Sequence, residues 1–186
     1  MDESQLLMYN VLMDNTLRQR VSQELLPLVQ KPGRYIGGEV NQIVKDHNDC
    51  DVTVALCFPD IYEIGSSHTG LAILYELVNR NPCWAAERVF TPWTDAEEVM
   101  RAKKIPFFSL ENRVSVRDFD IAGFSLTNEL CYTNMLNMLD LAGIPIESSA
   151  RCGDDPIVIA GGQMPNCCEP VADFIDVFLL GDGEKS

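Results

Sequence analysis

The sequence predicts an α/β protein in which five parallel strands form a Rossmann-like or flavodoxin-like sheet, preceded by an N-terminal helical segment. From residue 51 onward, short β-rich apolar runs alternate with helical patterns, which is typical of a parallel sheet with right-handed crossovers. Two late runs, Pro156–Gly162 and Ile175–Gly183, end at glycines, as buried parallel strands do when they bring backbone to a ligand. Apolar residues make up 46% of the 186-residue chain, which indicates a globular core.

The first 30 residues predict a mostly helical segment with apolar positions at Leu6, Leu7, Val11, Leu25, Leu26 and Val29. Lys31-Pro32-Gly33 interrupts this pattern, because proline and glycine disfavour helix interiors. A connector follows from Arg34 to Gln42. We therefore divide the chain into an N-terminal helical segment with its connector, residues 1–48, and an α/β domain, residues 49–186. The first part is expected to pack on the second or on a partner.

Strand and helix patterns alternate along the rest of the chain. The expected strands are residues 52–57, 87–91, 121–126, 157–160 and 177–180. Helices are expected over residues 68–79, from the capping-box pattern at Thr94, over residues 128–141, and briefly after Glu169. Five such strands suit the order 2-1-3-4-5, in which ligands bind at the carboxyl edge of the sheet.

Charge and hydropathy exclude several partners. The chain has 14 basic and 28 acidic residues, a net charge of −14, which argues against nucleic acid because phosphate binding needs clustered Lys and Arg. No apolar run approaches the ~20 residues that a bilayer span requires. The N-terminus lacks the form of a signal peptide. We expect a cytoplasmic protein with no nucleic-acid or membrane partner.

The seven cysteines carry no metal-binding pattern. Neither Cys-x-x-Cys nor Cys-x-x-x-Cys-x-x-Cys occurs, so zinc and iron–sulfur sites lack their usual spacing. Reduced thiols are the expected state. No Ser-His-Asp or paired-carboxylate arrangement is evident either, and the sequence predicts no catalytic residue and no metal ligand.

Candidate ligand-binding residues cluster at the expected strand ends. They are Gly65, Ser66 and His68 in the long loop after the first strand, Ser125 near the end of the third, and Gly161 and Gly162 at the end of the fourth. Small residues there allow a flat ligand to approach the backbone, although the glycines could serve only the turn. His68 could coordinate a metal or cofactor, or be an ordinary surface or capping histidine. The other histidine, His47, is expected to be exposed.

Several segments together resemble the N-terminal part of cobalamin-binding-domain radical S-adenosylmethionine proteins. They are Lys31–Tyr35, Phe58–Gly65, Gly123–Leu126, Asn137–Pro145, Ile159–Gly162 and Gly181–Glu184. The resemblance implies a Rossmann-like domain that binds cobalamin. Ser125, Gly161 and Gly162 would line the pocket of its nucleotide tail, and the loop from Gly65 to His68 would lie near the corrin.

The sequence departs from the pattern of that family in two places. The cobalt-ligating motif Asp-x-His-x-x-Gly is absent, since His68-Thr69-Gly70 has the wrong spacing. Cobalamin would then bind without a histidine on cobalt. The Cys-x-x-x-Cys-x-x-Cys motif, which family members carry after the Gly-Asp-Gly-Glu turn, is absent too. The resemblance therefore implies a fragment that is not catalytic alone, whose partner is a downstream radical domain holding a 4Fe-4S cluster and S-adenosylmethionine.

Two other interpretations of the sequence remain open. The domain could be a docking module that kept the fold without the cofactor, or it could be a flavodoxin-like flavin-binding domain. The flavin interpretation is weaker, because the first exit loop begins with Phe58-Pro59-Asp60 rather than with a Ser/Thr/Gly-rich phosphate cradle. The colour of the bound cofactor would separate them: corrin is red, flavin is yellow, and a docking module is colourless.

Overall fold

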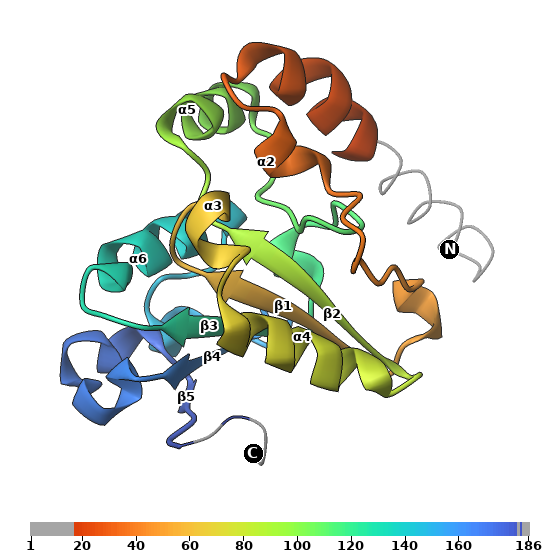
Figure 1. Cartoon of the computed structure of the whole chain (residues 1–186). Helices are drawn as coiled ribbons and strands as arrows, with labels where there is room; N and C mark the ends of the chain where they lie inside the picture. The colour runs from red at the N-terminus through yellow and green to blue at the C-terminus, as the bar shows by residue number, and fades with distance from the viewer. Residues whose placement is uncertain (1–16, 182, 184–186) are drawn as a thin grey trace.

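The computed structural model describes residues 17–181 and 183, and it contains a five-stranded, all-parallel sheet. The strand order is β2-β1-β3-β4-β5, as predicted (Figure 1). The strands are β1 (Val52–Phe58), β2 (Trp84–Phe90), β3 (Ile121–Leu126), β4 (Ile157–Gly162) and β5 (Val177–Phe178). The chain therefore has the doubly wound α/β architecture in which the carboxyl ends of all strands meet at one edge.

Helices connect the strands. The α-helices of this part are α3 (Tyr62–Gly65), α4 (Thr69–Arg80), α5 (Thr94–Lys103) and α6 (Cys131–Ala142). Short 3-10 turns occupy His47–Asp49, Val116–Asp118, Ser148–Ala150, Met164–Cys167 and Glu169–Phe174. Gly143 ends α6 in the left-handed conformation, with φ of 69°, as a C-terminal glycine commonly does. No helix among the described residues has both the length and the apolar character to cross a membrane.

Some predicted boundaries are wrong. β2 begins at Trp84 rather than Glu87, and β5 is shorter than expected. Thr94 does not form a capping box, because the N-cap position of α5 is Trp93 and no side chain bonds there. The helix expected from Asn128 begins at Cys131, since the Asn128 side chain accepts a hydrogen bond from the Leu130 N–H at 3.0 Å and forms a turn first.

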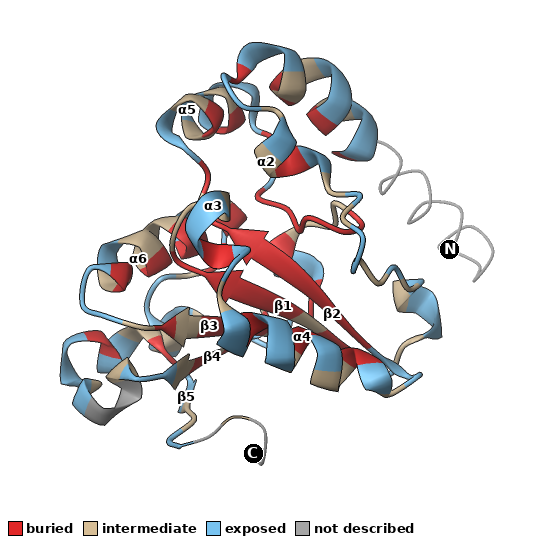
Figure 2. Ribbon diagram, in the orientation of Figure 1, coloured by how far each residue is buried: buried red, intermediate tan, exposed pale blue. Residues whose placement is uncertain are grey.

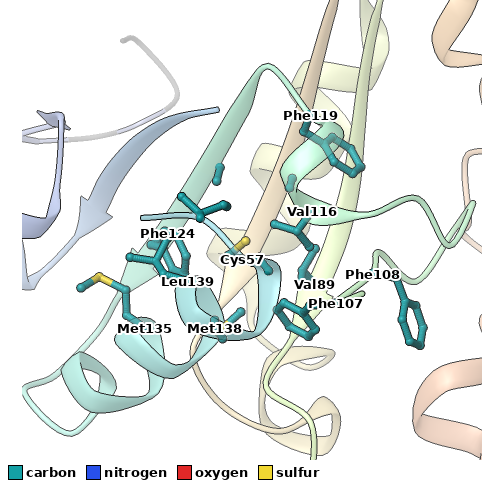
Figure 3. Packing of buried hydrophobic residues seen from close by; sticks show 14 of the residues in the cluster. Cys57, Val89, Phe107, Phe108, Val116, Phe119, Phe124, Met135, Met138 and Leu139 are labelled. Atoms are coloured by element: carbon teal, nitrogen blue, oxygen red, sulfur yellow. The ribbon is translucent and has the colours of Figure 1, made fainter. Parts of the chain in front are cut away.

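Two apolar layers cover the sheet. On one side, α6 contributes Met135, Met138 and Leu139 to the main core cluster, where they lie against Phe124 and other sheet residues (Figure 3). On the other side, α4 forms a smaller cluster with β1 and β2. Burial is densest along β1 and β2, while β4 and β5 are more exposed (Figure 2). This asymmetry leaves part of the α4 side of the sheet open.

The N-terminal segment packs on the α/β part through α5. It comprises a helical turn before Val21, a π-helical stretch (Val21–Leu25), a 3-10 turn (Leu26–Leu28) and α2 (Gly33–Ile36). Val21 and Leu25 are fully buried in the same core cluster as Met100 of α5. The helical positions expected at Leu6, Leu7 and Val11 lie outside the described residues.

Candidate functional site

Small residues meet on the α4 side of β3 and β4. Ser125 and Gly161 are register partners, so they face the same side of the parallel sheet. Gly123, two residues earlier on the same face, pairs with Leu56, which packs in the cluster formed with α4. A side chain is thus short or missing at three adjacent positions near the carboxyl edge, and we call Ser125 and Gly161 the cradle. Gly123 is buried, and the Ile159 side chain lies 3.5 Å from where its Cβ would be.

The cradle lies beside the open part of the sheet. Ile157 of β4 and Val177 of β5 share its face and are 53% and 45% exposed, but Ile157 begins β4 and Val177 pairs with Ile159, so both lie nearer the amino end of β4 than Gly161 does. α4 packs on β1 and β2, whereas the helix that contacts β4 most is the short 3-10 turn Met164–Cys167 that follows it. At the carboxyl end Ser125 and Gly161 are half-buried, and the chain after β5 returns toward α4, where a Cβ on Gly183 would lie 3.3 Å from Leu74.

Gly161 and Gly162 have different local roles. A Cβ on Gly161 would meet only the Cβ of Leu179, at an ordinary 3.8 Å. Gly162 has φ of +105°, and a Cβ there would lie 2.7 Å from the carbonyl oxygen of Leu126. Gly162 is required by the turn after β4, whereas Gly161 has space on the open face.

The loop after β1 folds into α3, and the last residue of this helix, Gly65, packs against two aromatic rings of the sheet. A Cβ on Gly65 would lie 2.4 Å from the ring of Phe90 and 3.0 Å from the ring of Phe58. The residue is buried. Ser66 is exposed and ends α3, its N–H donating to the carbonyl of Tyr62 at 2.8 Å. The close packing explains the glycine, and contact of Gly65 or Ser66 with a cofactor stays a prediction.

His68 caps α4. Its Nδ1 accepts a hydrogen bond from the Leu71 N–H at 3.2 Å, and its ring lies against Phe58 with centroids 4.9 Å apart. A neutral imidazole that accepts through Nδ1 carries its proton on Nε2. While it caps the helix, His68 therefore has no lone pair at Nε2 for a metal ion.

Replacing His68 with alanine is expected to destabilise the protein by about 0.5–2 kcal/mol, because α4 loses an N-cap acceptor. His68→Asn keeps a capping oxygen and should retain most of the stability. Urea unfolding of both variants checks the prediction. Equal losses in the alanine and asparagine variants would contradict a capping role.

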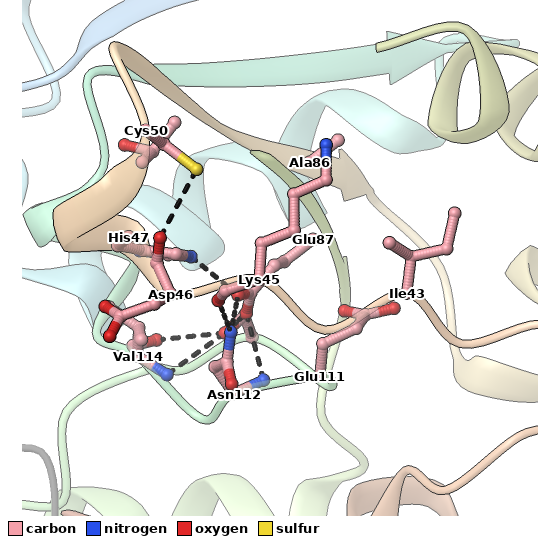
Figure 4. A network of polar contacts seen from close by, with 12 residues as sticks. Ile43, Lys45, Asp46, His47, Cys50, Ala86, Glu87, Glu111, Asn112 and Val114 are labelled. Atoms are coloured by element: carbon pink, nitrogen blue, oxygen red, sulfur yellow. Dashed lines mark hydrogen bonds and ion pairs between the residues drawn. The ribbon is translucent and has the colours of Figure 1, made fainter. Parts of the chain in front are cut away.

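The prediction that His47 is exposed is wrong. Its Nε2 lies 2.6 Å from Oε1 of Glu87, and its side chain is 18% exposed. Glu87 also accepts hydrogen bonds from Ser109 Oγ at 2.5 Å and from Asn112 Nδ2 at 2.6 Å. These residues form a closed network at the edge of β2 (Figure 4). The side chain of His47 thus points inward to a buried carboxylate, while its neighbours Asp46, Asn48 and Asp49 are exposed.

The network is structural in character. Burial alone would raise the pKa of Glu87, but hydrogen bonds from His47, Ser109 and Asn112 hold it below its ordinary value. Ser109 donates to Glu87 and not to His47, so the three do not form a nucleophile and base pair. The network ties the N-terminal connector to β2.

A second buried ion pair adjoins the first network. Arg88 donates through Nε to Oε1 of Glu111 at 2.6 Å and through Nη1 to Glu39, and its guanidinium lies 4.8 Å from the centroid of the Tyr75 ring. The other oxygen of Glu111 accepts from the Arg88 backbone N–H at 2.7 Å. β2 is an edge strand, and this hydrogen bond satisfies one of its backbone N–H groups. That N–H group is therefore not available for pairing with a strand of another chain.

The sequence contains one signal for these networks. Glu87 and Arg88 are charged residues inside a strand that the alternating pattern places in a buried sheet. Buried charges need partners, so polar residues elsewhere in the chain have to meet them. The identity of those partners, from residues 39–47 and 109–112, follows only from the fold.

Metal-binding side chains do not gather in the described part of the chain. There, no group of three or more His, Cys, Asp or Glu residues could hold an ion. All seven cysteines lie within the described residues and none forms a disulfide. Cys57 is fully buried, which raises the pKa of its thiol and keeps it unreactive.

Fold and site together define a doubly wound α/β domain with small residues paired near its carboxyl edge. A comparison with protein families matches residues 70–186, from α4 onward, to the family described as radical SAM proteins, N-terminal. The match spans more than half of the chain, and the chain belongs to this family. A search of curated proteins found no match. The expected relation to radical S-adenosylmethionine proteins is thus confirmed, and cobalamin binding stays a prediction.

Proposed function

We propose that this chain is the cobalamin-binding N-terminal domain of a radical S-adenosylmethionine enzyme and is not catalytic alone. The family match and the 2-1-3-4-5 sheet support a cofactor-binding role at the carboxyl edge. In this proposal residues 49–186 form the cofactor domain, residues 17–48 of the N-terminal part (1–48) buttress it, and a downstream radical domain with a 4Fe-4S cluster and S-adenosylmethionine is its partner.

The observation that carries the proposal is the pairing of Ser125 with Gly161, both half-buried, on the α4 side of β3 and β4. A flat nucleotide base needs two neighbouring strands without large side chains, and Ser125 and Gly161 provide this on β3 and β4. The hydroxyl of Ser125 would offer a hydrogen bond, and Ile159 and Val177 would supply apolar contacts beside it. These residues fit the tail of cobalamin. Bound cobalamin would supply radical chemistry at cobalt.

His68 would lie near the corrin without ligating cobalt. Its lone pair at Nδ1 is used by the N-terminus of α4, and ligation through Nε2 would require giving up that hydrogen bond. His68→Ala should therefore leave the visible spectrum of bound hydroxocobalamin unchanged, although it lowers stability. A shifted spectrum would contradict this part of the proposal.

Titration of the protein with hydroxocobalamin, followed by visible spectroscopy and calorimetry, tests the proposal. We expect saturable binding that Gly161→Leu weakens by about tenfold or more, because the side chain fills the cradle. Gly161 is the informative position, since its φ is ordinary and its surroundings are open. Gly153→Leu is the matched control, because a Cβ added at Gly153 would have no atom within 4 Å and the residue lies in the loop before β4.

Two outcomes would contradict the proposal. Equal affinity of Gly161→Leu and the unaltered protein would show that the cofactor, if bound, does not use this cradle. Absence of binding by the unaltered protein would favour the docking module, which positions a catalytic domain without holding a cofactor. A yellow chromophore in the purified protein would favour the flavin-binding alternative.

A further inference from the structure

Residues 31–39 lie across the loops that leave β1 and β2. α2, within this segment, is next to α3 at the carboxyl ends of these strands (Figure 1). Glu63 of α3 accepts hydrogen bonds from Lys31 Nζ at 3.2 Å and from Nε and Nη2 of Arg34 at 3.0 and 2.9 Å. The hydrogen bond from Arg34 is the main reason that the pKa of Glu63 falls to about 2.

Residues 31–39 also contact the loop after β2, through Trp93. The guanidinium of Arg34 lies 5.1 Å from the centroid of the Trp93 ring, a cation–π distance. The hydroxyl of Tyr35 accepts a hydrogen bond from the Trp93 N–H at 3.0 Å. Just before the segment, the Gln30 N–H donates to Asp95 at 2.7 Å. One guanidinium thus contacts the exit loops of two neighbouring strands at once.

Tyr62 of α3 contacts both the segment 31–39 and the end of β2. The hydroxyl of Tyr62 donates to Glu39, and its ring packs edge-on against Phe90 with centroids 5.5 Å apart. Gly65 lies close against the ring of Phe90. The short helix is therefore clamped between the end of β2 beneath it and residues 31–39 outside it.

We propose that residues 31–39 form a strap that positions the β1 exit loop, Gly65 to His68 included, for the ligand bound at the carboxyl edge. The inference rests on the proposed cofactor site. Arg34 and Glu63 are positioning residues, since neither lies at the cradle of Ser125 and Gly161. The Glu63 side chain is 40% exposed and that of Arg34 is 10% exposed. Because the carboxylate stays partly solvated, we expect the ion pair to add modest stability and the strap chiefly to order the loop.

Arg34→Gln tests the strap in the cobalamin-free protein first. Backbone amides of residues 62–68 should exchange hydrogen faster, and Trp93 fluorescence should change because the cation leaves the ring. The melting temperature should fall only modestly, because Glu63 remains in contact with water when it loses the cation. Arg101→Gln is the matched control: Arg101 also joins two elements, through Glu97 at 2.9 Å and Asp140 at 2.7 Å, but away from the carboxyl-edge loops.

The second readout is hydroxocobalamin affinity. Arg34→Gln should raise the dissociation constant about fivefold, with the visible spectrum of the bound state unchanged, and Arg34→Lys should recover part of the loss. Unchanged exchange at residues 62–68 overturns the strap. Faster exchange with unaltered affinity overturns its positioning role. If the unaltered protein binds no hydroxocobalamin, the proposed function fails and the ligand-positioning role with it, while exchange still decides whether the strap orders the loop.

Discussion

Arg88→Met is expected to destabilise the protein by about 3–5 kcal/mol at pH 8, because it leaves a buried carboxylate without its cation. The side chain of Glu111 has no exposed surface and depends on Arg88 for its charge partner. Glu39, the other carboxylate bound by Arg88, is 24% exposed and can turn to water. The loss should therefore come mainly from Glu111, and urea unfolding measures it.

The cost of Arg88→Met should depend on pH. Burial raises the pKa of Glu111 from 4.5 to about 7, even though Arg88 opposes this shift. A folded pKa above the unfolded one means that ionisation of Glu111 costs stability as pH rises from about 4.5 to 7. Removing Arg88 raises that pKa further, so the destabilisation should be smallest at pH 5 and should grow through pH 7 to pH 8.

A double variant separates the charge from the lost packing of the arginine. Arg88→Met with Glu111→Gln keeps an acceptor for the Arg88 backbone N–H but holds no charge at either position. Its free energy of unfolding should vary less with pH between 5 and 8, and it should be more stable than Arg88→Met at pH 8. A cost of Arg88→Met that is constant over this range would mean that Glu111 does not ionise in the folded protein.

Gly162→Ala is the second substitution with a large expected effect, a loss of about 2–4 kcal/mol in the free energy of unfolding. Gly162 has φ of +105°, and an alanine Cβ would lie 2.7 Å from the carbonyl oxygen of Leu126. That oxygen belongs to the backbone of β3 and also accepts a hydrogen bond from the Gln163 N–H at 3.1 Å. The clash cannot be relieved by rotating a side chain.

Gly161→Ala is the matched control for this prediction. It changes the neighbouring residue in the same strand, where the new Cβ would meet Leu179 at 3.8 Å, and it should cost less than about 1 kcal/mol. Chemical denaturation of both variants makes the comparison. Similar losses at the two positions would show that the turn after β4 accommodates an ordinary side chain.

The strand order and most of the helices could be predicted from local pattern. β3 occupies the expected residues, and α6 ends at Gly143 as expected. These features depend on apolar periodicity and on the conformational preference of glycine, which are properties of adjacent residues. Boundaries failed where a hydrogen bond overrode the pattern, as at Asn128, whose side chain forms a turn before α6.

The candidate site could be predicted only in part. The sequence singled out Ser125 and Gly161, and the register of β3 and β4 makes them direct neighbours on one face. The sequence could not show that Gly162 is needed for the turn whereas Gly161 tolerates a side chain. That difference depends on the φ angle of Gly162 and on its distance from the Leu126 carbonyl, and both are set by the pairing of β3 with β4. Whether a cofactor occupies the cradle stays a prediction.

The sequence by itself determined the α/β class, the alternation of strands and helices, and the small residues at strand ends, since each is encoded within a few neighbouring positions. Only the tertiary structure decided that His47 lies against Glu87, that Arg88 bridges Glu39 and Glu111, and that Arg34 joins the loops after β1 and β2. These contacts join residues 23 to 59 positions apart. Which charges pair over such separations depends on where the backbone places them. A buried charge is costly unless it is paired, so burial of one charged side chain requires a partner nearby.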